Sequence, residues 1–362
     1  MKFIKQALLH LLLICILFFL GTIAYHRIKT DREIEQLREA GYYHPVSVGD
    51  RWLNTAVFGN ENGRYTIVGL AGLGMGDFPV AARQMTRSLE ADHRVVFVDR
   101  AGYGLSDDTD QEMTIGTIVE DYRQALQYAG MKKPYILLAH SIGGAYANHW
   151  VSNYPDEIKA VVLVDGTQLS EEAFADEPAS EVDFGDRILA GLAKLGFSRF
   201  FLRDYFYQYP DNYTQQEQKL GDALMLMTLD SIAPVSEEGM LAGNAQTAFN
   251  EMVTNDVPKL YICSSWGFQT QNEILETNEW INRQIQINGL DMELRDVINT
   301  DEARMKELLD QYKTAREEII YPYAQKMGNC EVICLPGDHM IYEQKPEACG
   351  QLIKDFIDGL GR

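Results

Sequence analysis

After residue 45, short and nearly continuous apolar runs alternate with longer amphipathic stretches. Such runs predict strands buried on both faces, and the stretches between them predict helices. This alternation is typical of the α/β class, with a mostly parallel central sheet and helices on both faces. The predicted strands are 53–58, 65–70, 94–98, 135–138, 160–164, 259–263 and 331–335, and the main predicted helices are 81–90, 115–129, 145–152 and 348–360.

Two long polar stretches interrupt this alternation. Residues 168–256 and about 269–326 are charged and helical in period, and no flexible linker separates them from the strands. Insertions between the strands of such a sheet usually cover one of its edges. We therefore predict a helical lid over 168–256, a further helical insertion over about 269–326, and a core formed by 45–167 and 257–361.

The first apolar stretch is longer than the others. Residues 7–25 carry no formal charge, and about 19 such residues can cross a bilayer as a helix. A cleaved signal peptide usually has a shorter apolar stretch, although the small residues around Ala24 leave cleavage open. We predict a membrane anchor over 1–29, with a signal peptide as the alternative, followed by a polar stalk over 30–44.

Basic residues flank both ends of this stretch, so the positive-inside rule does not decide its orientation. Lys2 and Lys5 precede it, and Arg27, Lys29 and Arg32 follow it. We expect the N-terminus inside the cell and the remainder outside, because this arrangement needs only one common mode of insertion. The predicted localisation is a single-pass membrane protein with an extracytoplasmic main domain.

Charge and cysteine spacing narrow the classes of partner. The formal net charge of −21 gives a surface that repels phosphates, which argues against a nucleic-acid partner. The spacing of the five cysteines does not suggest a zinc site. Cys330 and Cys334 would lie about 13 Å apart along one strand, too far to bond each other. We expect the cysteines to be mostly buried thiols.

Four unusual loops follow predicted strands, and the carboxyl ends of parallel strands meet at one crevice. The first loop, 70–77 (LAGLGMGD), has three glycines that let backbone N–H groups turn toward an oxyanion, with a plain turn as the alternative. The second, 99–107 (DRAGYGLSD), is interpreted as a compact structural turn. The third and fourth loops contain a serine and a histidine.

Ser141 stands between a predicted strand and a predicted helix, in the stretch LLAHSIGGAY. A sharp strand–serine–helix turn projects the hydroxyl from the backbone and requires small neighbours, as in the pattern G-x-S-x-G. Ala139 takes the first glycine position here, and Gly143 takes the second. The backbone N–H groups of Ile142 and Leu73 are the candidate donors to an oxyanion.

His339 follows the last predicted strand, in the stretch LPGDHM. A histidine at this place can take the proton of the serine and return it to the leaving group. It also follows the serine in chain order. His140 is adjacent to Ser141 in sequence, so its side chain should point elsewhere, and we interpret it as structural.

The four loops, in this order, resemble the α/β-hydrolase superfamily over residues 45–167 and 257–361. The resemblance implies a parallel sheet, a nucleophile, a base and two oxyanion donors, at Ser141, His339, Leu73 and Ile142.

The acid departs from the usual pattern of this superfamily. The loop after the strand 258–263 reads SSWGF and contains no carboxylate. Some members place the acid after the preceding strand, where this chain has Asp165, and Asp165 is our first choice. Glu273 is the reserve, and a serine–histidine dyad without an acid is the third alternative.

The implied reaction is acyl transfer to water, from a small-molecule or lipid-like ester, with no metal or organic cofactor. A serine nucleophile argues against the haloalkane dehalogenase and epoxide hydrolase branches, which use aspartate at that position. The alternative function is a non-catalytic, membrane-anchored binding protein on the same fold. This alternative rests on the lack of a carboxylate in the loop after the strand 258–263.

Overall fold

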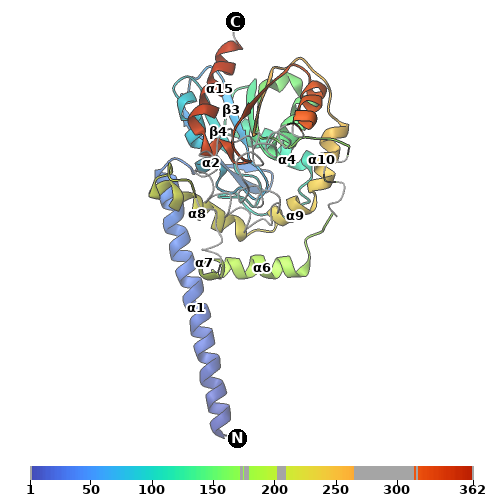
Figure 1. Cartoon of the computed structure of the whole chain (residues 1–362). Coiled ribbons are helices and arrows are strands. Elements are labelled where there is room, and N and C mark those ends of the chain that lie inside the picture. The colour runs from blue at the N-terminus through green and yellow to red at the C-terminus, as the bar shows by residue number, and fades with distance from the viewer. Residues whose placement is uncertain are drawn as a thin grey trace, which may run out of the picture.

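An eight-stranded sheet organises the chain (Figure 1). The computed structural model describes residues 2–171, 174, 179–201, 209–264, 314 and 317–360. The strands are β1 (Pro45–Val48), β2 (Arg51–Gly59), β3 (Thr66–Leu70), β4 (Arg94–Val98), β5 (Tyr135–His140), β6 (Ile158–Val164), β7 (Lys259–Ser264) and β8 (Cys330–Leu335).

The spatial order of the strands is β1-β2-β4-β3-β5-β6-β7-β8. β1 pairs antiparallel with β2, and β2 pairs antiparallel with β4. All other pairs are parallel. β3 and β5 are buried along their whole length, as expected for strands covered on both faces. The predicted α/β class with a mostly parallel sheet is confirmed.

Helices lie between the strands in the order predicted. They are α1 (Lys2–Glu39), α2 (Phe78–Ala81), α3 (Arg83–Thr86), α4 (Ile115–Tyr128), α5 (Gly143–Asn153), α6 (Phe184–Lys194), α7 (Ser198–Phe201), α8 (Gln215–Leu229), α9 (Ala233–Gly239), α10 (Leu241–Asn250), α14 (Ile341–Gln344) and α15 (Pro346–Gly359). Residues 317–327 are also helical.

Two predictions of local structure differ from this result. β1 has four residues and pairs through a tight turn at Gly49, whose φ is +61°, so its apolar signal is too short to stand out. The helix predicted over 81–90 divides into α2, α3 and the 3₁₀ segment Arg87–Leu89, and α2 begins with a proline in its first turn.

The two faces of the sheet carry separate hydrophobic clusters. One contains buried residues of α4, α5 and α10, such as Ile118, Trp150 and Ala245. The other contains buried residues of α2 and α15, such as Phe78 and Ile353. Figure 1 shows α4 and α10 on one side of the strands and α2 and α15 on the other.

Helices α6 to α10 form the predicted helical insertion between β6 and β7. Figure 1 shows α6, α8 and α9 beneath the sheet, on the side from which α1 extends. Of the second insertion predicted over 269–326, only residue 314 and residues from 317 onward are described.

Helix α1 runs without a break through the predicted anchor and into the predicted stalk. Within the described residues, it is the helix that is long and apolar enough to cross a membrane. Its apolar side chains are exposed over most of this length, including Leu12, Phe18 and Leu20. A buried core helix would hide them, so the exposure is consistent with a lipid surrounding.

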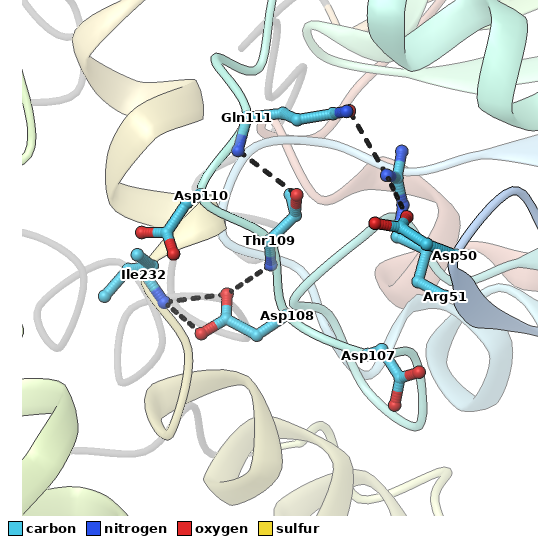
Figure 2. Close-up of a pocket in the computed structure, with 8 residues that line it drawn as sticks. All are labelled: Asp50, Arg51, Asp107, Asp108, Thr109, Asp110, Gln111 and Ile232. Carbon is cyan, nitrogen blue, oxygen red and sulfur yellow. Dashed lines mark hydrogen bonds and ion pairs between the residues drawn. The ribbon is translucent and has the colours of Figure 1, made fainter.

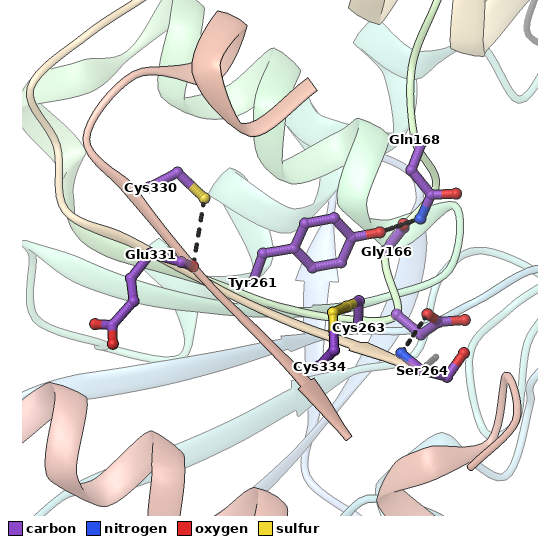
Figure 3. The surroundings of a disulfide bond; sticks show 9 residues. Gly166, Gln168, Tyr261, Cys263, Ser264, Cys330, Glu331 and Cys334 are labelled. Carbon is purple, nitrogen blue, oxygen red and sulfur yellow. Dashed lines mark hydrogen bonds between the residues drawn. A yellow bond between two sulfur atoms is a disulfide. The ribbon is translucent and has the colours of Figure 1, made fainter. Parts of the chain in front are cut away.

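A disulfide joins Cys263 on β7 to Cys334 on β8 (Figure 3). The two residues are direct partners in the parallel register, with Cα atoms 4.7 Å apart. The expectation of mostly buried thiols is therefore wrong for this pair, because strand pairing brings together two cysteines that are 71 positions apart in sequence. Cys15, Cys330 and Cys349 are free.

The thiol count tests this pairing. The unfolded, unreduced chain should react with three equivalents of a thiol reagent, and the reduced chain should react with five, because the sequence contains five cysteines and two of them are paired. A titration in guanidinium chloride, with and without prior reduction, measures both numbers. Five reactive thiols before reduction would contradict the disulfide.

Candidate active site

Ser141 lies on the sharp turn between β5 and α5. Its φ is +53°, which is unfavourable for a residue with a side chain and holds the hydroxyl away from the strand. Its backbone oxygen accepts hydrogen bonds from the N–H groups of Gly144 and Thr167, both at 2.9 Å. The turn is therefore fixed both within its own segment and by the segment that follows β6.

The turn requires small neighbours for a visible reason. A Cβ atom at Gly143 would lie 2.4 Å from the backbone oxygen of Leu70, and one at Gly144 would lie 3.2 Å from the Cα of Gly166. A Cβ at Gly72 would lie 3.1 Å from the Cβ of Ser141. The glycine-rich loop after β3 therefore runs directly beside the serine.

Asp165 follows β6 in a similar strained turn, with φ of +43°. Its side chain is 4% exposed. One carboxylate oxygen accepts a hydrogen bond from the backbone N–H of Ser264 at 2.9 Å, and the other lies 2.7 Å from Nδ1 of His339. The first contact ties the carboxylate to the end of β7 and orients the second toward the histidine.

His339 lies in the loop after β8, and its side chain is 47% exposed. With Nδ1 donating to Asp165, Nε2 is free to accept a proton. The structure contains no hydrogen bond between this imidazole and the Ser141 hydroxyl. Such contacts often tighten only when substrate binds.

His140 links the serine turn to the histidine loop. Its Nε2 donates to the backbone oxygen of His339 at 2.9 Å, and the two rings lie 4.6 Å apart between centroids. Burial, and to a smaller extent the neighbouring His339, lower the pKa of His140 to about 3, so this imidazole stays neutral. The structural interpretation of His140 is consistent with these contacts, which position the backbone of His339.

Asp338, next to His339, faces its own loop rather than the histidine. Its carboxylate accepts hydrogen bonds from the backbone N–H of Met340 at 2.7 Å and from the side chain of Gln344. Burial raises the pKa of Asp338 to about 7. We therefore infer that Asp338 stabilises the conformation of the loop that contains His339.

The predicted oxyanion donors flank the serine. Ile142 caps the N-terminus of α5, where helices leave backbone N–H groups without intrahelical partners. Leu73 follows Gly72, which lies against Ser141. The reserve acid Glu273 lies outside the described residues. The structure thus brings Ser141, Asp165, His339 and both donor positions to one edge of the sheet.

Sequence reasoning missed a buried ion pair that holds this loop. Arg100 donates to the backbone oxygens of Ala71 and Gly72, each at 2.8 Å, and to Glu237 of α9 at 2.9 Å. The Tyr146 hydroxyl donates to the same carboxylate at 2.5 Å. Burial opposes the charged guanidinium, but the Glu237 carboxylate holds the pKa of Arg100 above its usual value.

The turn 99–107 supports the same loop, and its interpretation as structural is consistent with its contacts. Oδ2 of Asp99 accepts hydrogen bonds from Asn54 and from the backbone of Leu105. The Tyr103 hydroxyl accepts from the backbone N–H of Gly74 at 3.2 Å. Burial raises the pKa of Asp99 to about 7.

An acidic pocket of about 680 Å³ lies between the loop 107–111 and Ile232, just before α9 (Figure 2). Asp108 accepts hydrogen bonds from the backbone N–H groups of Ile232 and Ala233 at the start of α9, and Asp110 pairs with Arg187 of α6 at 2.6 Å. These carboxylates therefore attach lid helices to the core. Among the described residues, no cluster of His, Cys, Asp and Glu could hold a metal ion.

Comparisons with known proteins agree with this architecture. A family model described as alpha/beta hydrolase fold matches residues 67–219. The uncharacterised protein YbdG of Bacillus subtilis (strain 168) is 31% identical over 164 residues, which cover 45% of this chain and 49% of that protein. The chain therefore spans about half the length of this curated relative.

Two solved structures resemble the chain over most of its length. A membrane phospholipase A, described as a bacterial virulence factor, has a TM-score of 0.55 and 17% identity, covering 100% of both chains. The haloalkane dehalogenase DbeA from Bradyrhizobium elkani USDA94 has a TM-score of 0.55 and 15% identity, covering 88% of this chain and 98% of that one. At these identities, the likeness shows the fold alone.

Glu237→Gln tests the buried ion pair. The change leaves a buried guanidinium without its counter-charge, and we expect the free energy of unfolding to fall by about 3 kcal/mol. Glu238→Gln is the matched control, because this exposed neighbour on the same helix should change stability by less than about 0.5 kcal/mol. Urea unfolding followed by circular dichroism measures both, and equal stabilities would contradict the role of the pair.

Proposed function

We propose that this chain, which has the α/β-hydrolase fold, is a membrane-anchored serine hydrolase. Its proposed reaction is the cleavage of an ester or related acyl bond. Ser141 is the proposed nucleophile, His339 the base, Asp165 the acid, and the N–H groups of Leu73 and Ile142 the oxyanion donors. The fold hosts several chemistries, so the argument depends on the site.

In the first half of the reaction, the Ser141 oxygen attacks the carbonyl carbon and Nε2 of His339 takes the hydroxyl proton. The carbonyl oxygen becomes an oxyanion and receives hydrogen bonds from the two donors. The bond to the leaving alcohol then breaks, and His339 gives its proton to that alcohol. The acyl group remains on Ser141.

In the second half, water attacks the acyl-enzyme and loses a proton to His339. The bond between the acyl carbon and Ser141 breaks, the serine regains the proton, and the carboxylic acid leaves. Throughout, Asp165 accepts the hydrogen bond from Nδ1 of His339. This bond fixes the tautomer and stabilises the imidazolium that forms.

The observation that carries the proposal is the 2.7 Å contact between Asp165 and His339 beside the strained turn of Ser141. Neither feature is needed to close a strand, and an imidazole oriented by a carboxylate is the base that a serine nucleophile requires. The non-catalytic alternative rested on the lack of a carboxylate in the loop after β7. Asp165, from the end of the neighbouring β6, contacts His339 in its place.

Labelling with a fluorophosphonate probe tests the nucleophile. The folded protein should form a covalent adduct at Ser141, and Ser141→Ala should form none, because the probe requires an activated serine. Ser152→Ala on α5 is the matched control and should label like the wild type. An unlabelled but folded wild type would refute the hydrolase.

Asp165→Asn tests the acid. In this variant the amide oxygen stays with the backbone N–H of Ser264, so the amide NH2 faces Nδ1 of His339 and favours the wrong tautomer. We expect kcat for a p-nitrophenyl ester to fall by about 10³ to 10⁴-fold. Glu273→Gln serves as the comparison and should leave kcat within about twofold. If Asp165→Asn retains wild-type turnover, the assignment of the acid is wrong.

The proposed anchor is supported by the exposed apolar surface of α1. A sodium carbonate wash of membranes removes peripheral proteins but leaves spanning helices in the pellet. We expect the full chain in the pellet and a chain lacking residues 2–29 in the supernatant. Release of the full chain would contradict an uncleaved span.

A further inference from the structure

Helix α6 presents an apolar face away from the core. Phe184, Ile188, Leu189 and Leu192 are between 36% and 79% exposed. At about 100° per residue, these side chains occupy one continuous side of the helix. An outward apolar face on a helix is the reverse of the usual surface pattern and marks a contact with another apolar phase.

The charged side chains of α6 lie on its other side. Arg187 pairs with Asp110 at 2.6 Å, and Lys194 pairs with Asp108 at 3.4 Å, both in the core loop after β4. Ala190 and Ala193 are buried beside them. These contacts fix the rotation of the helix. Phe184 and Ile188 are held outward, while Leu189 and Leu192 are exposed on one side and line a cavity on the other.

The chain after α6 is joined to the anchor helix. The ring of Phe197 lies 5.3 Å from that of Phe19, between centroids. Arg199 donates to the side chains of His26, Thr30 and Glu33, at 2.6 to 2.9 Å. The C-terminal end of α6 is therefore fixed at the level where the apolar run 7–25 gives way to charged residues.

This level coincides with a membrane surface. A helix of about 19 residues is about 28 Å long, close to the hydrocarbon thickness of a bilayer, so a span over 7–25 ends near Tyr25. Figure 1 shows α6 crossing beneath the body, on the side from which α1 extends. A helix in this position lies along the bilayer surface.

A cavity of about 670 Å³ lies behind α6. Its walls come from α6, the segment that follows α6, α8, α9 and the loop after β3. They are mainly apolar and include Leu189 and Leu192 of α6, with Phe197, Met225 and Val235. Leu73, the proposed oxyanion donor, and Gly74 also line it. The cavity therefore connects the membrane-facing helix with the loop beside Ser141.

We propose that the outward face of α6 inserts into the bilayer surface and that the cavity behind it receives an acyl chain of a membrane lipid ester. This proposal rests on the proposed function, since it requires both the anchor and the hydrolase site. The occupant of the apolar face is lipid rather than a second copy of the chain, because α1 brings this face to the level of the bilayer.

Photo-crosslinking in phosphatidylcholine vesicles tests the lipid contact without relying on activity. In the full-length chain, Ile188 is replaced by p-benzoylphenylalanine, and irradiation should give a lipid adduct. Tyr128, which is exposed at the end of α4 on the body of the protein, is the control and should give at most about one tenth as much. Leu12 on α1 is the positive control.

Each outcome decides between the claims. Adducts at positions 12 and 188 but not at 128 support the proposal. An adduct at 12 alone overturns the insertion of α6 and leaves the anchor intact. No adduct at 12 removes the anchor and the proposal together, and a protein–protein adduct at 188 indicates that a second copy covers the face.

Two variants that fill the cavity test the acyl site. Met225→Trp adds bulk from α8 and Val235→Trp adds bulk from α9. Each should lower the ratio of kcat/KM for a dodecanoyl ester to that for an acetyl ester by about tenfold or more. Lys219→Trp, exposed on α8 and outside the cavity, is the matched control. An unchanged ratio in both variants overturns the acyl site. A folded wild type that is not labelled by the fluorophosphonate refutes the hydrolase itself.

Discussion

The hydrogen bond between His339 and Asp165 is the constraint on which the site depends, because it joins two strands that are not neighbours. Asp165 ends β6 and His339 follows β8, with β7 between them. Ser264, at the end of β7, donates its backbone N–H to the other carboxylate oxygen and so helps to orient the side chain across β7 toward the histidine. Three adjacent parallel strands therefore cooperate to place one carboxylate against one imidazole, and a shift in the register of any of them would separate the pair.

The same edge is held from the other side by the lid. Arg100 binds the backbone of the loop beside Ser141 and the carboxylate of Glu237 on α9 at the same time. Two further carboxylates, Asp108 and Asp110, attach α9 and α6 to the core. The helical insertion between β6 and β7 therefore contributes one charge to the framework that positions the glycine-rich loop.

Local patterns in the sequence predict the features that depend on local chemistry. The turn at Ser141 can be recognised in the sequence because it requires small neighbours. His339 can be recognised because it follows the last predicted strand. Asp165 could be named only through a resemblance, since a single aspartate after a strand carries no local mark of its partner. Arg100 and Glu237 stand 137 positions apart, and their contact depends on how α9 packs on the core. The cysteine pair stands 71 positions apart and depends on strand order and register. Periodicity specifies neither. Glu273 stays a prediction.

The disulfide between β7 and β8 has a consequence for the segment that it encloses. It bonds two strands that are already direct neighbours, just below the carboxylate contact of Ser264 (Figure 3). The sequence between the cysteines begins and ends at one covalently fixed point, and the entropy of closing a loop grows only slowly with its length. Homologues can therefore lengthen, shorten or exchange this segment with little penalty to the pairing of the two strands, which makes it a natural place for the chain to diverge and for an engineer to graft a new module.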